Sequence, residues 1–158
     1  MKSKVLNAIL FVTWLAPFEL LALPEMVIGE ATISPGIHLT FEGAIKDNVA
    51  PLGVFLAENE TDVHIEMLAH WSKDAPKGSV PGGYVAYLQV ELLVKNESTD
   101  TSIAVQLAPH VNLSDNLHYA QNIKLPGKID DKYTVKFIIE SPMNGSLGLH
   151  YDWREQVG

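Results

Sequence analysis

Apolar and polar residues alternate along most of the chain after its first 24 residues. In the stretch 61–71, TDVHIEMLAHW, one set of alternating positions is apolar and the other carries His64, Glu66 and His70. Because successive side chains of a strand point to opposite faces, this pattern predicts a strand with one core face and one polar face. Residues two apart on a face are about 6 to 7 Å apart. His64 and Glu66 can therefore bend toward one cation.

The same alternation predicts further strands, which are separated by turns rich in proline, glycine and asparagine. We expect these strands at 25–34, 37–41, 84–95, 103–107 and 133–139, with at most a short one at 54–56. The connection 73–83 is expected to cross between two sheets. No amphipathic helical window follows the first 22 residues. The pattern therefore predicts an all-β fold, an immunoglobulin-like β-sandwich of about seven strands.

The first 22 residues differ from the rest in composition. Two lysines precede a long apolar run that ends near Ala22, which is the order of a secretory signal peptide. The alternative is a membrane anchor, but Pro17 and Glu19 interrupt the run before it reaches the roughly 20 apolar residues that a span needs. We expect a signal peptide at 1–22, a single domain at 23–158, a periplasmic location and no stable membrane span after cleavage.

Composition limits the chemistry that the chain can perform. The sequence has 158 residues, no cysteine and a net charge of −8. Without cysteine there are no disulfides and no thiolate ligands, so a metal must be held by histidine, methionine or carboxylate. The negative charge repels phosphate backbones and attracts cations. Nucleic acid is therefore not an expected partner.

Histidines supply the candidate site. His110 and His118 fall in the stretch 109–121, which we expect to be a polar loop, and His150 falls in a later turn-rich segment. Loops on a rigid sandwich are where binding groups normally lie. Isolated histidines, however, are more often solvated surface residues, and we expect this of His38 and His70. The spacing alone leaves both readings of the other histidines open.

Several segments together resemble a known family. They are IGEATI near the expected mature start, DVHIEMLAHW, the hairpin PGGYVAYLQVELLVKNESTDT, the APH…LHYAQNIKLPGK segment and the terminal LHYDWREQVG. In this order they are similar to the periplasmic high-affinity iron-transport proteins associated with FTR-type iron permeases. The treponemal membrane lipoprotein antigen belongs to the same family. The likeness runs from about Val27 to Gly158, and relatives usually continue with one further strand.

The resemblance implies a homodimer that binds a divalent metal ion, with copper or iron as the ion and zinc or manganese as a surrogate. The metal ligands that the resemblance implies are His64, Glu66, His118 and His150, and we expect His110 to be a ligand as well. Relatives usually have methionine where this chain has His110. A thioether favours Cu(I), whereas imidazoles and a carboxylate suit divalent ions, with Cu(II) bound most tightly. We expect the exchange to shift the site away from Cu(I).

We therefore expect a non-enzymatic periplasmic protein that captures a divalent cation for iron uptake and passes it to an inner-membrane permease. Because histidine binds metal only when neutral, affinity should fall as pH drops through about 6.5. Two alternatives stay open. One is a metal-dependent ferrous oxidase or superoxide-reacting enzyme on the same ligands. The other is a structural or adhesion module in which the histidines are incidental.

Overall fold

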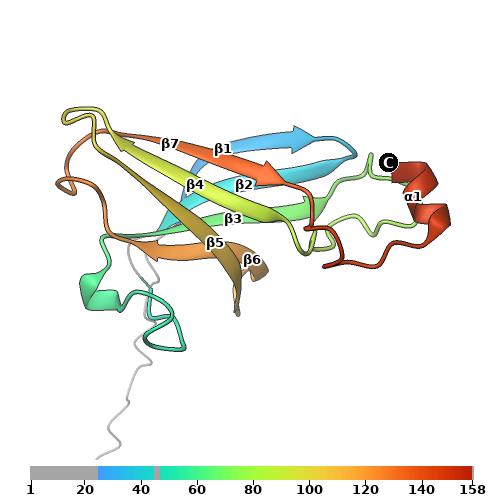
Figure 1. Ribbon diagram of the computed structural model, residues 1–158, viewed down its shortest axis with the longest axis horizontal. Helices are drawn as coiled ribbons and strands as arrows, with labels where there is room; N and C mark the ends of the chain where they lie inside the picture. Colours follow the sequence, from blue (N-terminus) through green and yellow to red (C-terminus); the bar gives the residue numbers. More distant parts are fainter. Residues whose placement is uncertain (1–24, 45–46, 158) are drawn as a thin grey trace, which may run out of the picture.

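The computed structural model describes residues 25–44 and 47–157, so the expected signal peptide lies outside the described residues. Seven strands account for most of the described chain (Figure 1). They are β1 (Met26–Ile33), β2 (Ile37–Ala44), β3 (Val63–Trp71), β4 (Gln89–Asn96), β5 (Ser102–Asn112), β6 (Asn116–Ile123) and β7 (Tyr133–Glu140). Two short helices complete the described elements, the 3₁₀ helix η1 (Glu58–Glu60) and α1 (Tyr151–Val157).

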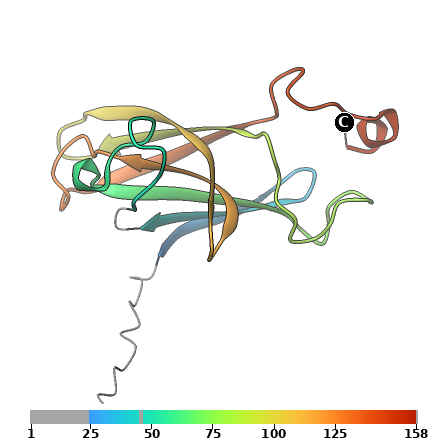
Figure 2. The same ribbon diagram turned by 90° about the horizontal axis from the view of Figure 1, so that it is seen from below.

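The strands form one curled antiparallel sheet that folds over itself into two layers. The strand order is β1-β2-β3-β6-β5-β4-β7. Strands β1, β2, β3 and β6 form one layer and β4 and β7 the other, and Figure 2 shows β5 bending from one to the other. The first half of β5 pairs with β4 and the second half, from Ala108, pairs with β6. The predicted seven-stranded β-sandwich is therefore confirmed.

The core lies between the two layers and follows from the alternation of the strands. On β4, the alternate residues Val90, Leu92 and Val94 are fully buried. Across the layers, the rings of Phe41 on β2 and Phe137 on β7 lie with centroids 4.3 Å apart. Burial of such side chains contributes about 1.5 to 3 kcal/mol each. Because the chain has no disulfide, this packing stabilises the scaffold that carries the polar face of β3.

Three predictions of secondary structure are wrong. The strand predicted at 84–95 begins only at Gln89, because Tyr87 has a positive φ of 65° that breaks the extended chain. The loop predicted at 109–121 consists mostly of β5 and β6, with a turn only at 113–115. Pro109 is tolerated within β5, although it has no amide hydrogen for a ladder bond. The helix α1 was also not predicted, because its seven residues are too few to show a helical period.

The two ends of the sandwich differ. The loop 47–60 with η1 lies at the end where β3 begins, and the C-terminal segment with α1 lies at the opposite end (Figures 1 and 2). Trp153 of α1 packs edge-on against Trp71, the last residue of β3, with ring centroids 5.8 Å apart. No helix among the described residues is long and apolar enough to cross a membrane. The candidate site lies toward the end where β3 begins.

Candidate metal centre

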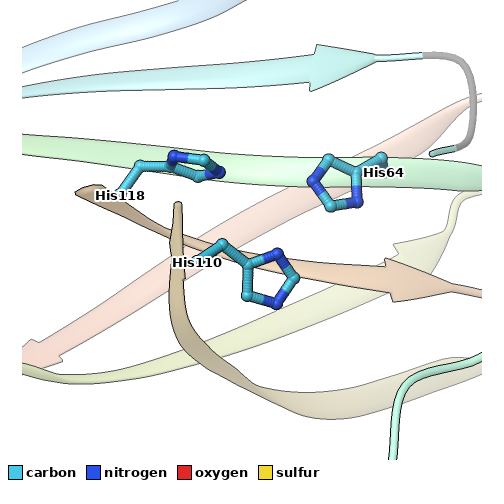
Figure 3. Close-up of side chains that lie close together, drawn as sticks. All are labelled: His64, His110 and His118. Atoms are coloured by element: carbon cyan, nitrogen blue, oxygen red, sulfur yellow. The ribbon is translucent and has the colours of Figure 1, made fainter. Parts of the chain in front are cut away.

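Three histidines from three neighbouring strands converge on one point (Figure 3). His64 is on β3, His110 on β5 and His118 on β6, and one ring nitrogen of each lies within 4.8 Å of the others. The register explains the convergence. His110 lies opposite His118 across β5 and β6, and Glu66 lies opposite the small Ala120 across β3 and β6. The methyl group of Ala120 leaves room above the sheet for the imidazole rings.

Glu66 adds a carboxylate to the histidine cluster. Its Oε1 lies 3.1 Å from Nε2 of His64, and its Oε2 lies 3.7 Å from Nε2 of His118. The exposed fractions of the four residues are 1% for His64, 2% for Glu66, 8% for His110 and 1% for His118. A buried carboxylate among imidazoles needs compensating positive charge, since isolated buried charge is strongly disfavoured. A proton or a metal ion can supply that charge.

Two hydrogen bonds set which nitrogen of each ring can bind a metal. The side-chain amide of Asn122 donates to the carbonyls of Asp47 and Leu56, each at 2.8 Å, so its oxygen is the atom that lies 2.7 Å from Nδ1 of His64. Nδ1 of His64 must therefore carry the hydrogen. In His118, Nδ1 donates to the backbone carbonyl of Asn116 at 3.0 Å. Both rings thus direct Nε2 toward Glu66, and such oxygen partners are typical of metal-binding histidines.

The pKa values of His64 and His110 are shifted in opposite directions. Burial alone would lower the pKa of His64, but hydrogen bonds with Glu66 and Asn122 outweigh it and raise the pKa above 6.5. Burial and the neighbouring charges of His64 and His118 lower the pKa of His110 to about 4. In the metal-free protein at a pH below the raised pKa of His64, this residue therefore carries a proton on Nε2, which lies 3.1 Å from Oε1 of Glu66. His110 is neutral and ready to bind.

The residues present fit a metal ion. Oε2 of Glu66 and Nε2 of His110 are both buried and form no hydrogen bond within the described part of the chain. Leaving such a group without a partner costs about 1 to 3 kcal/mol, and more when the group is charged. An ion bound between the three imidazoles and the carboxylate would give Oε2 of Glu66 a partner. Nitrogen and oxygen donors of this kind suit Cu(II), Zn(II), Ni(II) and Fe(II).

The proton on Nε2 of His64 leads to a prediction about metal binding. We expect binding of one divalent ion at a pH below the raised pKa of His64 to release about one proton, because the ion replaces the proton on Nε2 of His64. Release should disappear as the pH rises through the raised pKa of His64. Below that pKa, affinity should fall about tenfold per pH unit for each competing proton. Calorimetric titration in buffers of different ionisation enthalpy measures the release, and a buffer-independent enthalpy would contradict it.

A group of carboxylates lies beside the histidines on the same face. Glu42 lies opposite Glu66 across β2 and β3, and one carboxylate oxygen from each of Glu25, Glu42 and Glu66 lies within 4.8 Å of the others. Desolvation and the charges of Glu66, Asp115 and Glu42 raise the pKa of Glu25 to about 7. Desolvation and Glu66 likewise raise the pKa of Glu42. At a pH above these raised pKa values the ionised carboxylates add negative potential that attracts a cation to the site.

The loop 47–60 covers the histidine cluster. The ring of Phe55 packs edge-on against His110, with centroids 4.7 Å apart. Asn122 fastens this loop to β6 through the carbonyls of Asp47 and Leu56. The side-chain amide of Asn122 therefore both orients His64 and holds the loop 47–60 in place over the site. The loop excludes water from the site.

The structure brings together four of the five predicted ligands, His64, Glu66, His110 and His118. It does not place His150 with them. His150 is exposed and lies just before α1, at the end of the molecule opposite the start of β3. From His64 to Trp71, which packs against α1, β3 alone extends about 23 Å. His70 is partly buried and lies opposite His38, outside the cluster.

Four residues of the site's surroundings were not found from the sequence. Asn122 and Phe55 act on the ligands from distant parts of the chain, and nothing in their local pattern marks them. Glu25 and Glu42 join Glu66 only through strand pairing. The alternation of His38, Thr40 and Glu42 on β2 was a usable signal for a polar face, but it does not show which strand lies beside it.

The fold and the site define a class, a β-sandwich with a buried centre of histidine and carboxylate. Solved structures of the same architecture include a copper-bound variant of P19 from Campylobacter jejuni, with 27% sequence identity and a TM-score of 0.75 over 85% of this chain and 88% of that one. A copper-bound variant of FetP from uropathogenic Escherichia coli strain F11 has 26% identity and a TM-score of 0.74, covering 86% and 89%.

The family follows from the sequence comparison. Residues 22–158 match the model of the Fe2+ transport protein family, and the chain belongs to that family. It is also 26% identical over 137 residues to UPF0423 proteins of Brucella abortus and Brucella suis, covering 85% of this chain and 74% of theirs. The family and the copper-bound neighbours together support a metal-binding role in iron uptake, as the sequence analysis expected.

Proposed function

We propose that this protein captures a divalent cation, iron or copper, in the periplasm and delivers it to an inner-membrane permease without catalysing a reaction. The observation that supports this most is the buried cluster of His64, His110, His118 and Glu66, whose free nitrogens and unpartnered oxygen converge on one point. The ion is the cargo. P19 and FetP, which share the fold at 26 to 27% identity, have been solved with copper bound. FetP was expressed in the periplasm.

The arrangement favours capture over catalysis. Three imidazoles and a carboxylate supply four donors, and the loop 47–60 covers them with Phe55. A catalytic metal keeps an open position for substrate or water. The test is turnover of Fe(II): the metal-loaded protein should leave aerobic Fe(II) oxidation at its uncatalysed rate while binding Fe(II) anaerobically. Multiple turnovers per chain would replace this proposal with the ferrous oxidase. Absence of both binding and turnover would favour the structural module.

His150 can join the site only from a second copy of the chain, because in its own chain it lies at the far end of the sandwich. Exposed apolar residues flank both parts. Leu149 and Tyr151 stand beside His150 with 54% and 80% of their surface exposed, and Val111 and Leu113 stand beside the cluster with 72% and 105%. We propose that the C-terminal segment of one copy covers the β5–β6 turn of the other. The resulting homodimer would place each His150 at its partner's cluster.

Mixing two defective variants tests this arrangement. Each of the variants His150→Ala and His118→Ala should bind Cu(II) more weakly than the native chain. A heterodimer of the two combines one intact cluster with one intact His150 and so has one complete site of its two. With random exchange of subunits in an equimolar mixture, tight binding should return at about a quarter of all sites. A titration that shows no gain on mixing would mean that His150 does not act between chains. Unchanged affinity in the His150→Ala variant would exclude it as a ligand.

His110 stands where relatives usually have methionine. We propose that this exchange determines which oxidation state of copper the site prefers. His110 is buried, and one of its ring nitrogens lies within 4.8 Å of ring nitrogens of His64 and His118, so we propose that it is a ligand. The variant His110→Met should bind Cu(I) more tightly and Cu(II) more weakly than the native chain, since a thioether is a softer donor than imidazole. Competition titrations with chelators of each oxidation state measure both. Cu(I) affinity no greater than that of the native protein would refute the proposal.

A further inference from the structure

A second pair of histidines lies on the face that carries the metal centre. His38 on β2 is directly opposite His70 on β3 in the strand register. Side chains directly opposite on neighbouring antiparallel strands share a face, with Cβ atoms about 4.5 to 5.5 Å apart. Both residues are partly buried, and both line one shallow surface depression together with Trp71, Ser72 and Lys73. The imidazole of one is therefore within reach of any ion bound by the other.

Thr32 orients one of the two rings. It lies opposite His38 on β1, and its hydroxyl is 3.4 Å from Nδ1 of His38. An oxygen partner on one nitrogen leaves the other nitrogen available, which is the arrangement usually found around metal-binding histidines. Among the described residues, neither His38 Nε2 nor the ring of His70 forms a hydrogen bond. The row Thr32, His38, His70 thus runs across three strands and offers two uncommitted imidazoles.

This pair is separate from the metal centre described above. His70 is four residues from Glu66 along β3, and His38 is four residues from Glu42 along β2, a distance of about 13 Å in each strand. Leu68 and Thr40 lie opposite each other between the two groups. An ion held by His38 and His70 therefore shares no ligand with the histidine cluster.

We propose that His38 and His70 form a second, solvent-facing site for a divalent first-row transition metal such as Cu(II), Ni(II) or Zn(II), with water completing the coordination. Imidazole pairs suit these ions. The exposed carboxylate of Glu30, one position along the same face, is a local negative charge, whereas Lys73 beside the depression opposes a cation. With two protein ligands instead of four, this site binds more weakly than the cluster and fills second. It extends the proposed function and does not depend on it.

A two-step Cu(II) titration tests the proposal. The native chain should take up one tight equivalent and then one weaker equivalent. His38→Ala and His70→Ala should each weaken the second step at least tenfold and leave the first unchanged. Thr40→Ala, on the same face between the two groups, is the matched control and should alter neither step. A second step that survives both histidine variants, or that is absent from the native chain, would overturn the proposal.

Nuclear magnetic resonance of the native protein gives a test that needs no substitution. When the second equivalent of Cu(II) is added, paramagnetic broadening should affect the amides of Thr32, His38 and His70 before those of other exposed residues. Broadening confined to His150 or spread evenly over the acidic surface would mean that the second ion binds elsewhere. Failure of the first step alone would count against the proposed function, and failure of the second step alone against this site.

Discussion

The variant His118→Ala is expected to bind Cu(II) at least about 100-fold more weakly than the native chain. Loss of an outer-shell partner alone costs about 10- to 100-fold in metal affinity, and loss of a direct ligand should exceed that range. His118 supplies one of three converging imidazoles, and its removal also takes away the Nε2 that lies 3.7 Å from Oε2 of Glu66. Competition with a chelator of known affinity measures the change.

The control for this variant is Lys124→Ala, which removes an exposed cation just after β6. Its Cu(II) affinity should stay within about twofold of the native value, because the charge is solvated and screened. Circular dichroism of both variants should keep the native β signal. A folded His118→Ala variant that binds Cu(II) like the control would show that the cluster of three histidines is not the metal centre.

The variant Asn122→Leu is expected to destabilise the metal-free protein by about 3 kcal/mol or more. Asn122 is 4% exposed and bonds to three groups, Nδ1 of His64 and the carbonyls of Asp47 and Leu56. Leucine of similar volume would leave the buried Nδ1 of His64 and the two part-buried carbonyls without this partner. A fully buried unpaired group costs about 1 to 3 kcal/mol, and the two lost bonds to the loop add to that cost. Urea unfolding followed by tryptophan fluorescence measures the free energy. Metal affinity should fall as well, because His64 loses the bond that orients its ring.

The matched control is Asn144→Leu, at an exposed position of the C-terminal segment. A surface substitution of this kind should change the free energy of unfolding by no more than about 0.5 kcal/mol. Equal stabilities of the two variants would mean that the bonds of Asn122 to the loop 47–60 contribute little. Loss of stability without any loss of metal affinity would separate the loop from the metal centre.

Much of the sandwich could be predicted because strand alternation is a local property. The apolar positions of β3 and β7 and the turns between strands can be seen within ten residues. The two strands that carry His110 and His118 were missed for a physical reason. Pro109 and the asparagines of this stretch disfavour regular structure, yet pairing with β4 and with β6 fixes β5 in extended form on both sides of the proline. Tertiary pairing outweighs local preference there.

The candidate site could be predicted in its residue types but not in its surroundings. His64 and Glu66 stand out because they lie on one face of a clear strand. Their burial does not follow from the strand, since it comes from the loop 47–60 and from β6. Strand register decides that Glu42 lies beside Glu66, and a shift of one residue would have turned it to the other face. The position of His150 likewise depends on the path of the last segment, which no local pattern fixes.

The most direct test of the account is a Cu(II) titration of the chain from residue 23 onward, followed by electron paramagnetic resonance of the first equivalent. We expect one tight ion per chain with at least three coordinated nitrogens, from His64, His110 and His118. Loss of one nitrogen coupling in each single variant of these residues would complete the assignment. Weak binding of many ions, or a first equivalent with fewer than three nitrogens, would contradict a buried histidine centre.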